Sequence, residues 1–242
     1  MTTSTTRIVA ITGGAGALGS ALAAHLVGQG YRVALFDTER AKERLEQLTV
    51  QLGKEHALAH AGDFGAEATW VGALAATKAA FGAHPTHGVL VAGGYDGGAP
   101  LHAAKDDAGY TKMISLNVDT AYRALRAMLP SMVDAKHGSI VVVGSRAVER
   151  PWTGAGSAAY AASKAAVVTM AQAVAAEVLE HGVRINAILP STMDTPANRS
   201  AMPDADPSRW VSLDSASRVV AFLLSEDARD VSGAAVPVYG RA

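Results

Sequence analysis

The segment that decides the fold is Arg7-Ile-Val-Ala-Ile-Thr12-Gly13-Gly14-Ala15-Gly16-Ala17-Leu18-Gly19. Its β-branched run, Arg7–Thr12, predicts a strand, and the stretch Ala17–Gln29 predicts a helix. Glycines between them permit a sharp turn and let backbone N–H groups approach a pyrophosphate, which the helix dipole also favours. An ordinary tight turn is the alternative, but the placement directly after a first strand favours dinucleotide binding.

The rest of the chain alternates short β-branched runs with longer Ala-rich amphipathic stretches. Strands are expected at 31–36, 56–60, 88–92, 139–143, 183–189 and 234–238, and helices at 39–52, 67–81, 107–132, 157–180 and 215–224. This alternation predicts an α/β fold in which a single domain, residues 1–242, forms a Rossmann-type doubly wound parallel sheet of about seven strands flanked by helices. The Pro- and Asp-rich segment after residue 190 is irregular, and it is expected to form a substrate lid over about 190–212.

The composition favours a cytoplasmic protein that binds neither nucleic acid nor membrane. With 21 basic and 22 acidic side chains the formal net charge is −1, which gives no electrostatic footprint for a polyanion. The chain has no cysteine, which excludes disulfides and fits a reducing compartment. The opening segment Met1–Thr6 is polar, and the apolar stretch Ala165–Leu179 is expected to be too short to span a bilayer.

Two carboxylates follow the second and third expected strands. Asp37 lies about 20 residues beyond the glycine loop, where an acid can bind both ribose hydroxyls of NAD and repel the 2′-phosphate of NADP. NAD(H) is therefore the expected cofactor, although the nearby Arg40 leaves NADP(H) open. Asp63 is placed to bind the adenine amino group. Either residue could instead cap a helix.

A proton-transfer pair is indicated by Tyr160-Ala-Ala-Ser-Lys164. Residues four apart share one helical face, and an ammonium beside a phenol lowers the phenol pKa from about 10 toward neutrality. Tyr160 would then serve as a general acid or base for a carbonyl–alcohol pair. A strand-end serine, Ser145, and a polar residue of the long middle helix, Asn117, precede the pair along the chain.

The features described so far follow one another over nearly the whole chain: a glycine loop, an acid, an asparagine, a strand-end serine and a Tyr-x-x-x-Lys pair. In the order of these features the chain resembles the short-chain dehydrogenase/reductase family. The resemblance implies that Tyr160 exchanges the substrate proton and that Lys164 holds the nicotinamide ribose. It implies further that Ser145 orients the substrate oxygen, that Asn117 holds a relay water, and that Thr195 contacts the nicotinamide carboxamide. The cofactor would be bound by Gly13, Gly16, Ala17, Leu18, Gly19, Asp37, Asp63, Ala92, Gly93, Tyr160, Lys164, Pro190 and Thr195. Asn117 and Thr195 could alternatively do no more than satisfy backbone groups.

Several positions depart from the usual family pattern. Ala17 stands where the second loop glycine is common, Leu90-Val-Ala-Gly93 replaces Asn-Asn-Ala-Gly, and Pro190-Ser191 replaces Pro-Gly. The stretch Leu189–Trp210 is similar to that of quinonoid dihydropteridine reductases, as is Gly16–Ser20, although those enzymes generally lack a serine at the position of Ser145.

The expected activity is NAD(H)-dependent interconversion of a small-molecule carbonyl and a secondary alcohol. Three alternatives remain: reduction of a quinonoid dihydropterin, reduction of a 3-oxoacyl thioester, and a non-catalytic NAD-binding regulator. The family resemblance implies a homodimer or homotetramer that pairs through the two long middle helices, and the Ala-rich face Ala158–Ala176 would permit such packing or an internal one. No metal site is expected, because His84-Pro-Thr-His87 has no carboxylate partner nearby. Two roles remain open for four large side chains: they could line a substrate pocket or simply pack the lid. These side chains are Tyr95, Trp152, Met193 and Trp210.

Overall fold

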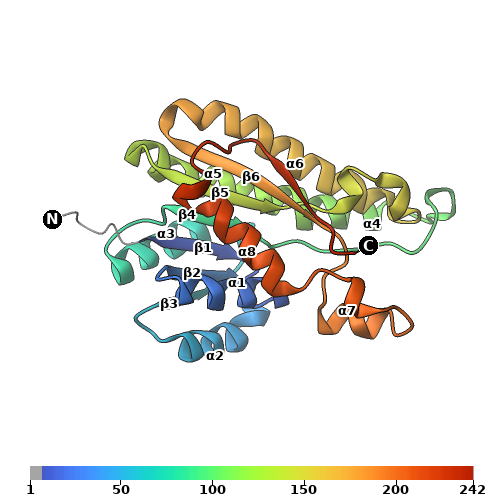
Figure 1. Ribbon diagram of the computed structural model, residues 1–242, viewed down its shortest axis with the longest axis horizontal. Coiled ribbons are helices and arrows are strands. Elements are labelled where there is room, and N and C mark those ends of the chain that lie inside the picture. Colours follow the sequence, from blue (N-terminus) through green and yellow to red (C-terminus); the bar gives the residue numbers. More distant parts are fainter. Residues whose placement is uncertain (1–6, 242) are drawn as a thin grey trace.

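The computed structural model describes residues 7–241; Met1–Thr6, the polar opening segment considered above, and Ala242 lie outside them. Within the described residues a parallel sheet of seven strands runs in the order β3-β2-β1-β4-β5-β6-β7 (Figure 1). The strands are β1 (Ile8–Thr12), β2 (Arg32–Asp37), β3 (Ala57–Ala61), β4 (His87–Leu90), β5 (Gly138–Val143), β6 (Val183–Pro190) and β7 (Ala235–Val238). The prediction of a single-domain, doubly wound α/β fold is confirmed.

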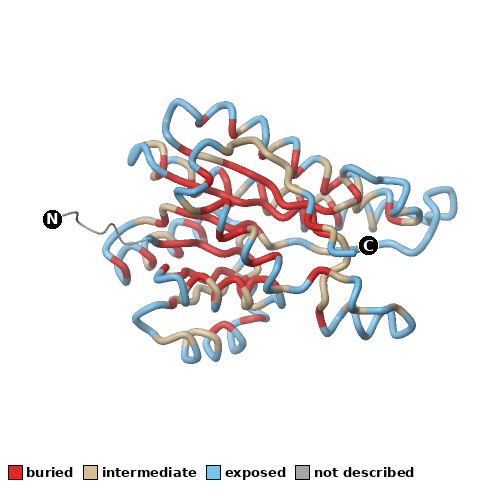
Figure 2. The backbone as a smooth tube through the Cα atoms, in the orientation of Figure 1, coloured by how far each residue is buried: buried red, intermediate tan, exposed pale blue. Residues whose placement is uncertain are grey.

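Helices cover both faces of the sheet, which is why every residue of the central strands β1, β4 and β5 is buried. One layer holds α1 (Ala17–Gly28), α2 (Lys42–Leu52) and α8 (Leu213–Leu224), and the other holds α3 (Glu67–Phe81), α5 (Thr120–Ala135) and α6 (Ala158–Val178). Side chains of β1 alternate between the layers, because Val9 and Ile11 join one apolar cluster and Ala10 joins the other. The buried backbone in Figure 2 accordingly follows the sheet.

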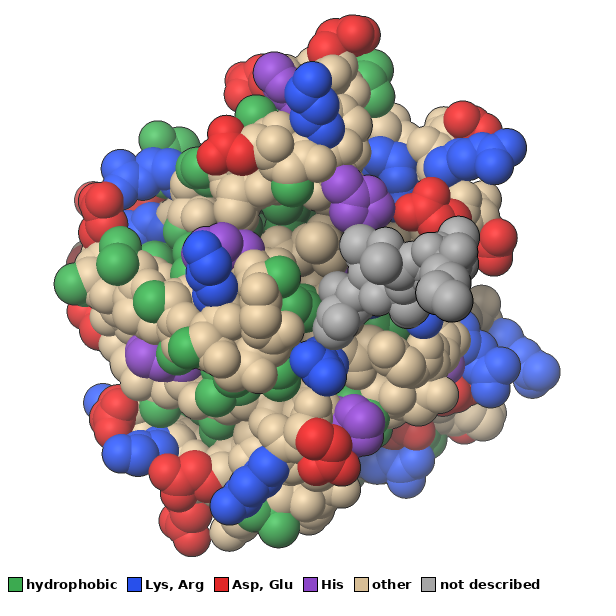
Figure 3. Space-filling view, turned by 90° about the vertical axis from the view of Figure 1, so that its left-hand side faces the viewer, with side chains coloured by type: hydrophobic (Ala, Val, Ile, Leu, Met, Phe, Trp, Pro, Cys, Tyr) green, Lys and Arg blue, Asp and Glu red, His purple; other side chains and the backbone are tan. Residues whose placement is uncertain are grey.

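The edge strands are less buried than the centre. β3 has one buried residue and four half-buried ones, whereas all six residues of β5 are buried. The other edge, β7, contains Pro237, which is tolerated because one side of an edge strand has no ladder to complete. At the end of the molecule where the strands begin, charges of both signs are interspersed (Figure 3).

The long middle helix expected over 107–132 is not one continuous α-helix. It consists of α4 (Ala108–Met113), the π-helical segment η3 (Ile114–Asp119) and α5. The wider turn is associated with two residues that bond outside the α pattern: Asn117 bonds to Gly94, and the hydroxyl of Thr120 donates to the Leu116 carbonyl at 2.6 Å. Single π turns recur at functional sites, and the apolar periodicity of a sequence does not reveal them.

The segment expected to form a lid leaves the sheet at Pro190, the last residue of β6. It contains the short helix α7 (Pro196–Ala201), and it is closed at its base where Met193 pairs with Val211. In Figure 1, α7 lies at the end of the molecule toward which the strands run. That edge is where an open parallel sheet binds its ligands.

The longest helix is a part of the fold's core layer. Together with the turn that follows it, the helix spans Ala158–His181 and by length and composition alone is long and apolar enough to cross a membrane, whereas its apolar stretch 165–179 was expected to be too short. Its inner face packs along the sheet and buries Lys164 beside Val167, Val168 and Ala171. Burial of one face against the sheet is typical of a core helix.

Candidate active site

The glycine loop between β1 and α1 leaves almost no room for side chains. Gly13 has φ +67°, and a Cβ there would lie 3.0 Å from the Ala92 nitrogen. A Cβ on Gly19 would lie 2.2 Å from the Gly13 carbonyl oxygen. Ala17, by contrast, is exposed at the first position of α1, so its methyl group is accommodated where the family often has glycine.

The start of α1 presents backbone donors to this loop. Gly16 is the N-cap and provides no side-chain acceptor, so the amides of Ala17, Leu18 and Gly19 have no partner within the helix. Such a helix N-terminus could hold a pyrophosphate through these amides and the helix dipole. These three residues, which the sequence predicted to bind the cofactor, therefore lie together at a site that could bind an anion.

Asp37 ends β2 beside the glycine loop. Its Oδ2 accepts a hydrogen bond of 3.0 Å from the Ala15 amide, and its Oδ1 accepts one of 2.8 Å from the Thr38 amide. The carboxylate therefore fixes the loop to β2, and its remaining lone pairs could still accept ribose hydroxyls. Asp63 is exposed, and its Oδ1 accepts from the Gly65 amide at 2.8 Å, so the structure shows it stabilising the turn before α3.

The ends of β1 and β4 are tied together without the usual amide side chain. The Ala92 amide donates to the Thr12 hydroxyl at 3.1 Å, and Leu90 instead fills an apolar cluster. Thr12 was not singled out from the sequence; as the last residue of β1, just before the glycine loop, it could have been.

Tyr160 and Lys164 lie one turn apart on α6, as expected, and Ser145 lies two residues after β5. Lys164 is only 7% exposed, and its Nζ donates a hydrogen bond of 2.9 Å to the Val143 carbonyl. Burial lowers the pKa of Lys164 to about 8. The Ser145 hydroxyl accepts from the Ala147 amide at 3.2 Å, which fixes its position at the strand end.

The expected lowering of the Tyr160 pKa is not found in this structure. Burial raises the pKa of the Tyr160 hydroxyl, the neighbouring Ser145 hydroxyl lowers it, and the phenol of Tyr95 raises it further. Lys164 is not among these causes, and its ammonium donates its hydrogen bond to the Val143 carbonyl. Helical spacing alone predicted that the ammonium lies against the phenol, whereas the long lysine side chain reaches the end of β5.

Asn117 connects three parts of the site. Its Oδ1 accepts from the Gly94 amide at 2.9 Å, and its Nδ2 donates to the Gly94 carbonyl at 3.1 Å and to the Ser163 hydroxyl at 2.9 Å. A Cβ on Gly93 would lie 2.4 Å from Asn117 Oδ1 and 3.4 Å from Lys164 Nζ. Asn117, Gly93 and Lys164 therefore meet at one point, and the polar side chain does satisfy backbone groups.

Ser163 is a further residue that sequence reasoning missed. It is fully buried, it receives the Asn117 amide, and its own hydroxyl donates to the Tyr160 carbonyl at 2.8 Å. Its position one residue before Lys164 on the inner face of α6 was the available signal. At the lid, Thr195 caps α7 by accepting from the Asn198 amide at 3.1 Å, and Pro190 pairs with Val238.

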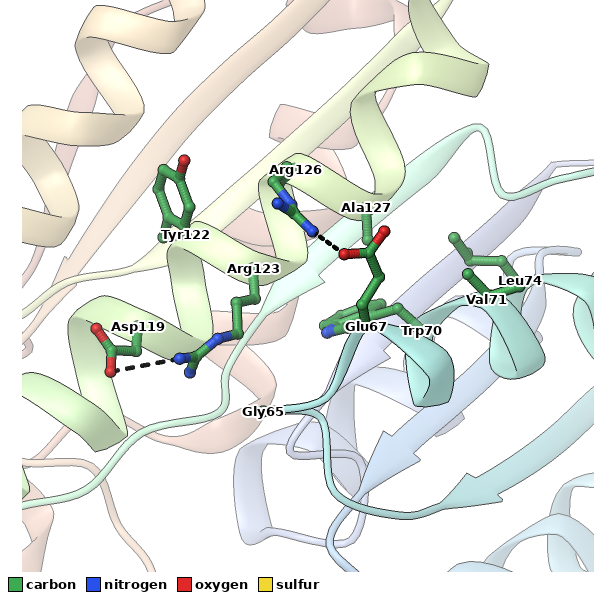
Figure 4. Close-up of a pocket in the computed structure, with 10 residues that line it drawn as sticks. All are labelled: Gly65, Glu67, Trp70, Val71, Leu74, Asp119, Tyr122, Arg123, Arg126 and Ala127. Atoms are coloured by element: carbon green, nitrogen blue, oxygen red, sulfur yellow. Dashed lines mark hydrogen bonds and ion pairs between the residues drawn. The ribbon is translucent and has the colours of Figure 1, made fainter.

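A cavity of about 780 Å³ lies away from these residues, between α3 and α5 (Figure 4). Its charged side chains are paired with one another, Arg126 with Glu67 and Arg123 with Asp119. It contains none of the candidate catalytic side chains. Residues 7–241 also hold no cluster of three His, Asp or Glu side chains that could bind a metal.

A buried lysine, a phenol, a strand-end hydroxyl and a glycine loop at the carboxyl edge of a parallel sheet are features of a nicotinamide-dependent oxidoreductase. The family model for short chain dehydrogenases matches residues 7–206, so the chain belongs to that family and is an oxidoreductase. It acts as an NAD(P)-dependent carbonyl/alcohol oxidoreductase.

Individual proteins agree with this assignment. The chain is 29% identical to the 2,5-dichloro-2,5-cyclohexadiene-1,4-diol dehydrogenase LinX of Sphingobium indicum, over 97% of this chain and 95% of that protein. A crystal structure of NAD⁺-bound xylitol dehydrogenase aligns with a TM-score of 0.85 at 25% identity, covering 97% of this chain and 98% of that one. The 3-ketoacyl-(acyl-carrier-protein) reductase of Brucella melitensis complexed with NADH aligns with a TM-score of 0.84 at 26% identity, with the same coverage. The expected resemblance to quinonoid dihydropteridine reductases is not shown by these comparisons.

Proposed function

We propose that this protein transfers a hydride between NAD(H) and a small carbonyl or secondary alcohol, with Tyr160 as the acid–base residue. The proposal rests on the convergence of Tyr160, Ser145, Lys164 and Asn117 at the carboxyl edge of the sheet, one loop away from the glycine turn. The bound nicotinamide would supply or accept the hydride. The protein's part is to position the substrate and move its proton.

The residues around the glycine turn fit a dinucleotide. Gly13 and Gly19 keep Cβ atoms out of the most crowded part of the loop, and the free amides at the start of α1 would bind the pyrophosphate. Asp37 has lone pairs beyond its two backbone bonds, so it would accept the ribose hydroxyls and disfavour a 2′-phosphate. The named structures with bound NAD⁺ and NADH support a nicotinamide cofactor, and Asp37 is our reason for preferring NAD(H).

In the reductive direction Tyr160 gives its hydroxyl proton to the substrate oxygen, and Ser145 orients that oxygen by a second hydrogen bond. Because burial raises the Tyr160 pKa, the hydroxyl holds its proton at neutral pH until the oxygen becomes basic. Lys164, anchored on Val143 beside Gly93, would bond the nicotinamide ribose and stabilise the phenolate once it forms. Asn117 fixes Gly94, and thereby the loop that carries Gly93.

The decisive experiment is oxidation of NADH and NADPH by the purified protein across a carbonyl panel that includes a quinonoid dihydropterin and a 3-oxoacyl thioester. We expect turnover of a ketone or aldehyde with NADH, and loss of that turnover in Tyr160→Phe with NADH binding retained. Turnover restricted to the pterin or to the thioester would replace the proposal with one of those activities. Substantial turnover by Tyr160→Phe would overturn the acid–base assignment.

We further propose a homo-oligomer that packs through α5 and α6. The inner face of α6 is buried against the sheet, yet its outer face still carries small residues, with Ala162, Ala166, Ala173 and Ala176 exposed. On the neighbouring elements Leu116 and Tyr122 are also exposed. Light scattering should find a dimer or tetramer that Ala166→Arg dissociates; a monomeric wild-type protein would contradict this.

A further inference from the structure

Tyr95 lies beside the proposed acid–base residue, yet most of its ring is exposed. Its ring centroid is 5.0 Å from that of Tyr160, and the two rings are inclined at 71°. The Tyr95 side chain nevertheless remains 64% exposed. An aromatic ring that touches the reacting phenol and faces open space on its other side borders the volume that a substrate must occupy.

The segment around Tyr95 is held on both sides. Gly94, the preceding residue, makes both of its backbone hydrogen bonds to Asn117. Asp96, the following residue, forms an ion pair of 2.9 Å with Lys112. The amide of Gly98, three residues after Tyr95, donates to the Gly156 carbonyl at 2.9 Å, and this bond connects the loop to the segment before α6. The backbone that carries the ring is therefore fixed to three different parts of the fold.

Gly97 also restricts the Tyr95 ring. A Cβ on Gly97 would lie 2.7 Å from the Tyr95 hydroxyl oxygen and 2.7 Å from the Cβ of Ser157. The absence of a side chain at Gly97 thus lets the phenol end of Tyr95 lie against the loop that precedes α6. A large ring that is held in place while exposed loses side-chain entropy without the stabilisation that full burial would provide. Such exposed apolar rings are typical of binding surfaces.

From this arrangement we infer that Tyr95 is a specificity-determining residue that selects ring-bearing substrates, by stacking its exposed ring on a planar ring whose carbonyl or hydroxyl oxygen bonds to Tyr160. The inference rests on the proposed function, because it assigns the reacting oxygen to Tyr160. Aromatic rings attract one another beyond the area they bury, so the selection would favour aryl or conjugated cyclic ketones over open chains. That the LinX relative is named for a cyclohexadiene diol is consistent with a ring substrate.

The test compares acetophenone with 2-octanone, two methyl ketones of equal carbon number that differ in the ring. We expect Tyr95→Leu to lower kcat/KM for acetophenone by about three- to tenfold, mainly through KM, and to change that for 2-octanone by less than about twofold. Tyr95→Phe should keep the preference, because it keeps the ring. Phe222→Leu, which alters an exposed aromatic residue of α8 on the other face of the sheet, serves as the control and should change neither value.

An equal loss on both ketones would overturn the inference, because it would mean that Tyr95 only supports Tyr160. A binding measurement separates this failure from failure of the proposed function. Calorimetric titration of the NADH complex with 1-phenylethanol and 2-octanol should show tighter binding of the ring alcohol, lost in Tyr95→Leu. Ring binding that depends on Tyr95 without any ketone turnover would refute the proposed function alone, whereas turnover without ring selectivity would refute the role of Tyr95 alone.

Discussion

The Nζ of Lys164 donates a hydrogen bond of 2.9 Å to the carbonyl oxygen of Val143, the last residue of β5. This bond anchors the lysine of α6 to the strand that leads to Ser145. Burial, rather than this ammonium, dominates the pKa of Tyr160 and raises it.

The ionisation of Tyr160 in the cofactor-free protein follows from this relationship. Since burial raises its pKa above 10.0, the tyrosinate should form only in more alkaline solution than for an ordinary tyrosine. Added NAD⁺ should lower the midpoint, because a positive nicotinamide ring nearby favours the phenolate. Ultraviolet titration of wild type minus Tyr160→Phe measures both values. A near-neutral midpoint without cofactor would show that Lys164 controls the phenol directly.

Cofactor preference should depend on the carboxylate of Asp37. Replacing it in Asp37→Ala removes charged hydrogen bonds to the ribose, so KM for NADH should rise roughly tenfold or more while discrimination against NADPH narrows. Glu39→Ala, which removes an exposed carboxylate paired only loosely with Lys42 at 3.7 Å, is the matched control. Steady-state kinetics with both cofactors provide the measurement. If Asp37→Ala still prefers NADH as strongly, another residue sets the choice.

The close approach at Gly19 gives a prediction about stability. A methyl group there would meet the Gly13 carbonyl oxygen at 2.2 Å, so Gly19→Ala should lower the free energy of unfolding by about 1–3 kcal/mol and abolish NADH binding. Gly28→Ala, in the same helix with no atom within 4 Å, should instead raise it by up to about 1 kcal/mol. Urea unfolding and fluorescence titration with NADH test the pair. Equal behaviour of the two variants would contradict the crowding argument.

The stability of the protein in mild acid should depend on His87. Burial, aided by the positive charges of His137, Arg184 and Arg7, lowers the pKa of His87 from 6.5 to about 3. Below pH 6.5 the His87 side chain therefore becomes protonated in the unfolded chain but stays neutral in the folded one. The stabilisation of the folded state that is present above pH 6.5 is progressively lost as the pH falls toward 3. Between pH 7 and 5 this amounts to about 2 kcal/mol.

Urea unfolding of wild type and His87→Gln at these two pH values isolates the contribution, because only the difference between pH values is compared. The loss of unfolding free energy between pH 7 and 5 should be smaller by about 2 kcal/mol in His87→Gln than in wild type. It should be unchanged in His102→Gln, which alters an exposed histidine. An unchanged dependence in His87→Gln would show that other groups govern acid stability.

The sequence predicted the architecture because its signals are local. Strand and helix periods, the glycine turn and the spacing of Tyr160 and Lys164 each extend over a few residues, and helical geometry alone puts that pair one turn apart. The parallel, doubly wound sheet then follows from short right-handed crossovers. Ser145 could be placed at a strand end for the same reason.

Other features were decided only when distant segments met. The π turn contains Asn117, whose side chain makes hydrogen bonds to both backbone groups of Gly94, a residue 23 positions earlier in the chain. The partner of Lys164 is set by how closely α6 packs on β5, and Tyr95 lies beside Tyr160 because Asn117, Lys112 and Gly156 hold its loop. Local periodicity determines which elements form, whereas side-chain partners depend on how closely separate elements pack, which no short stretch of sequence contains.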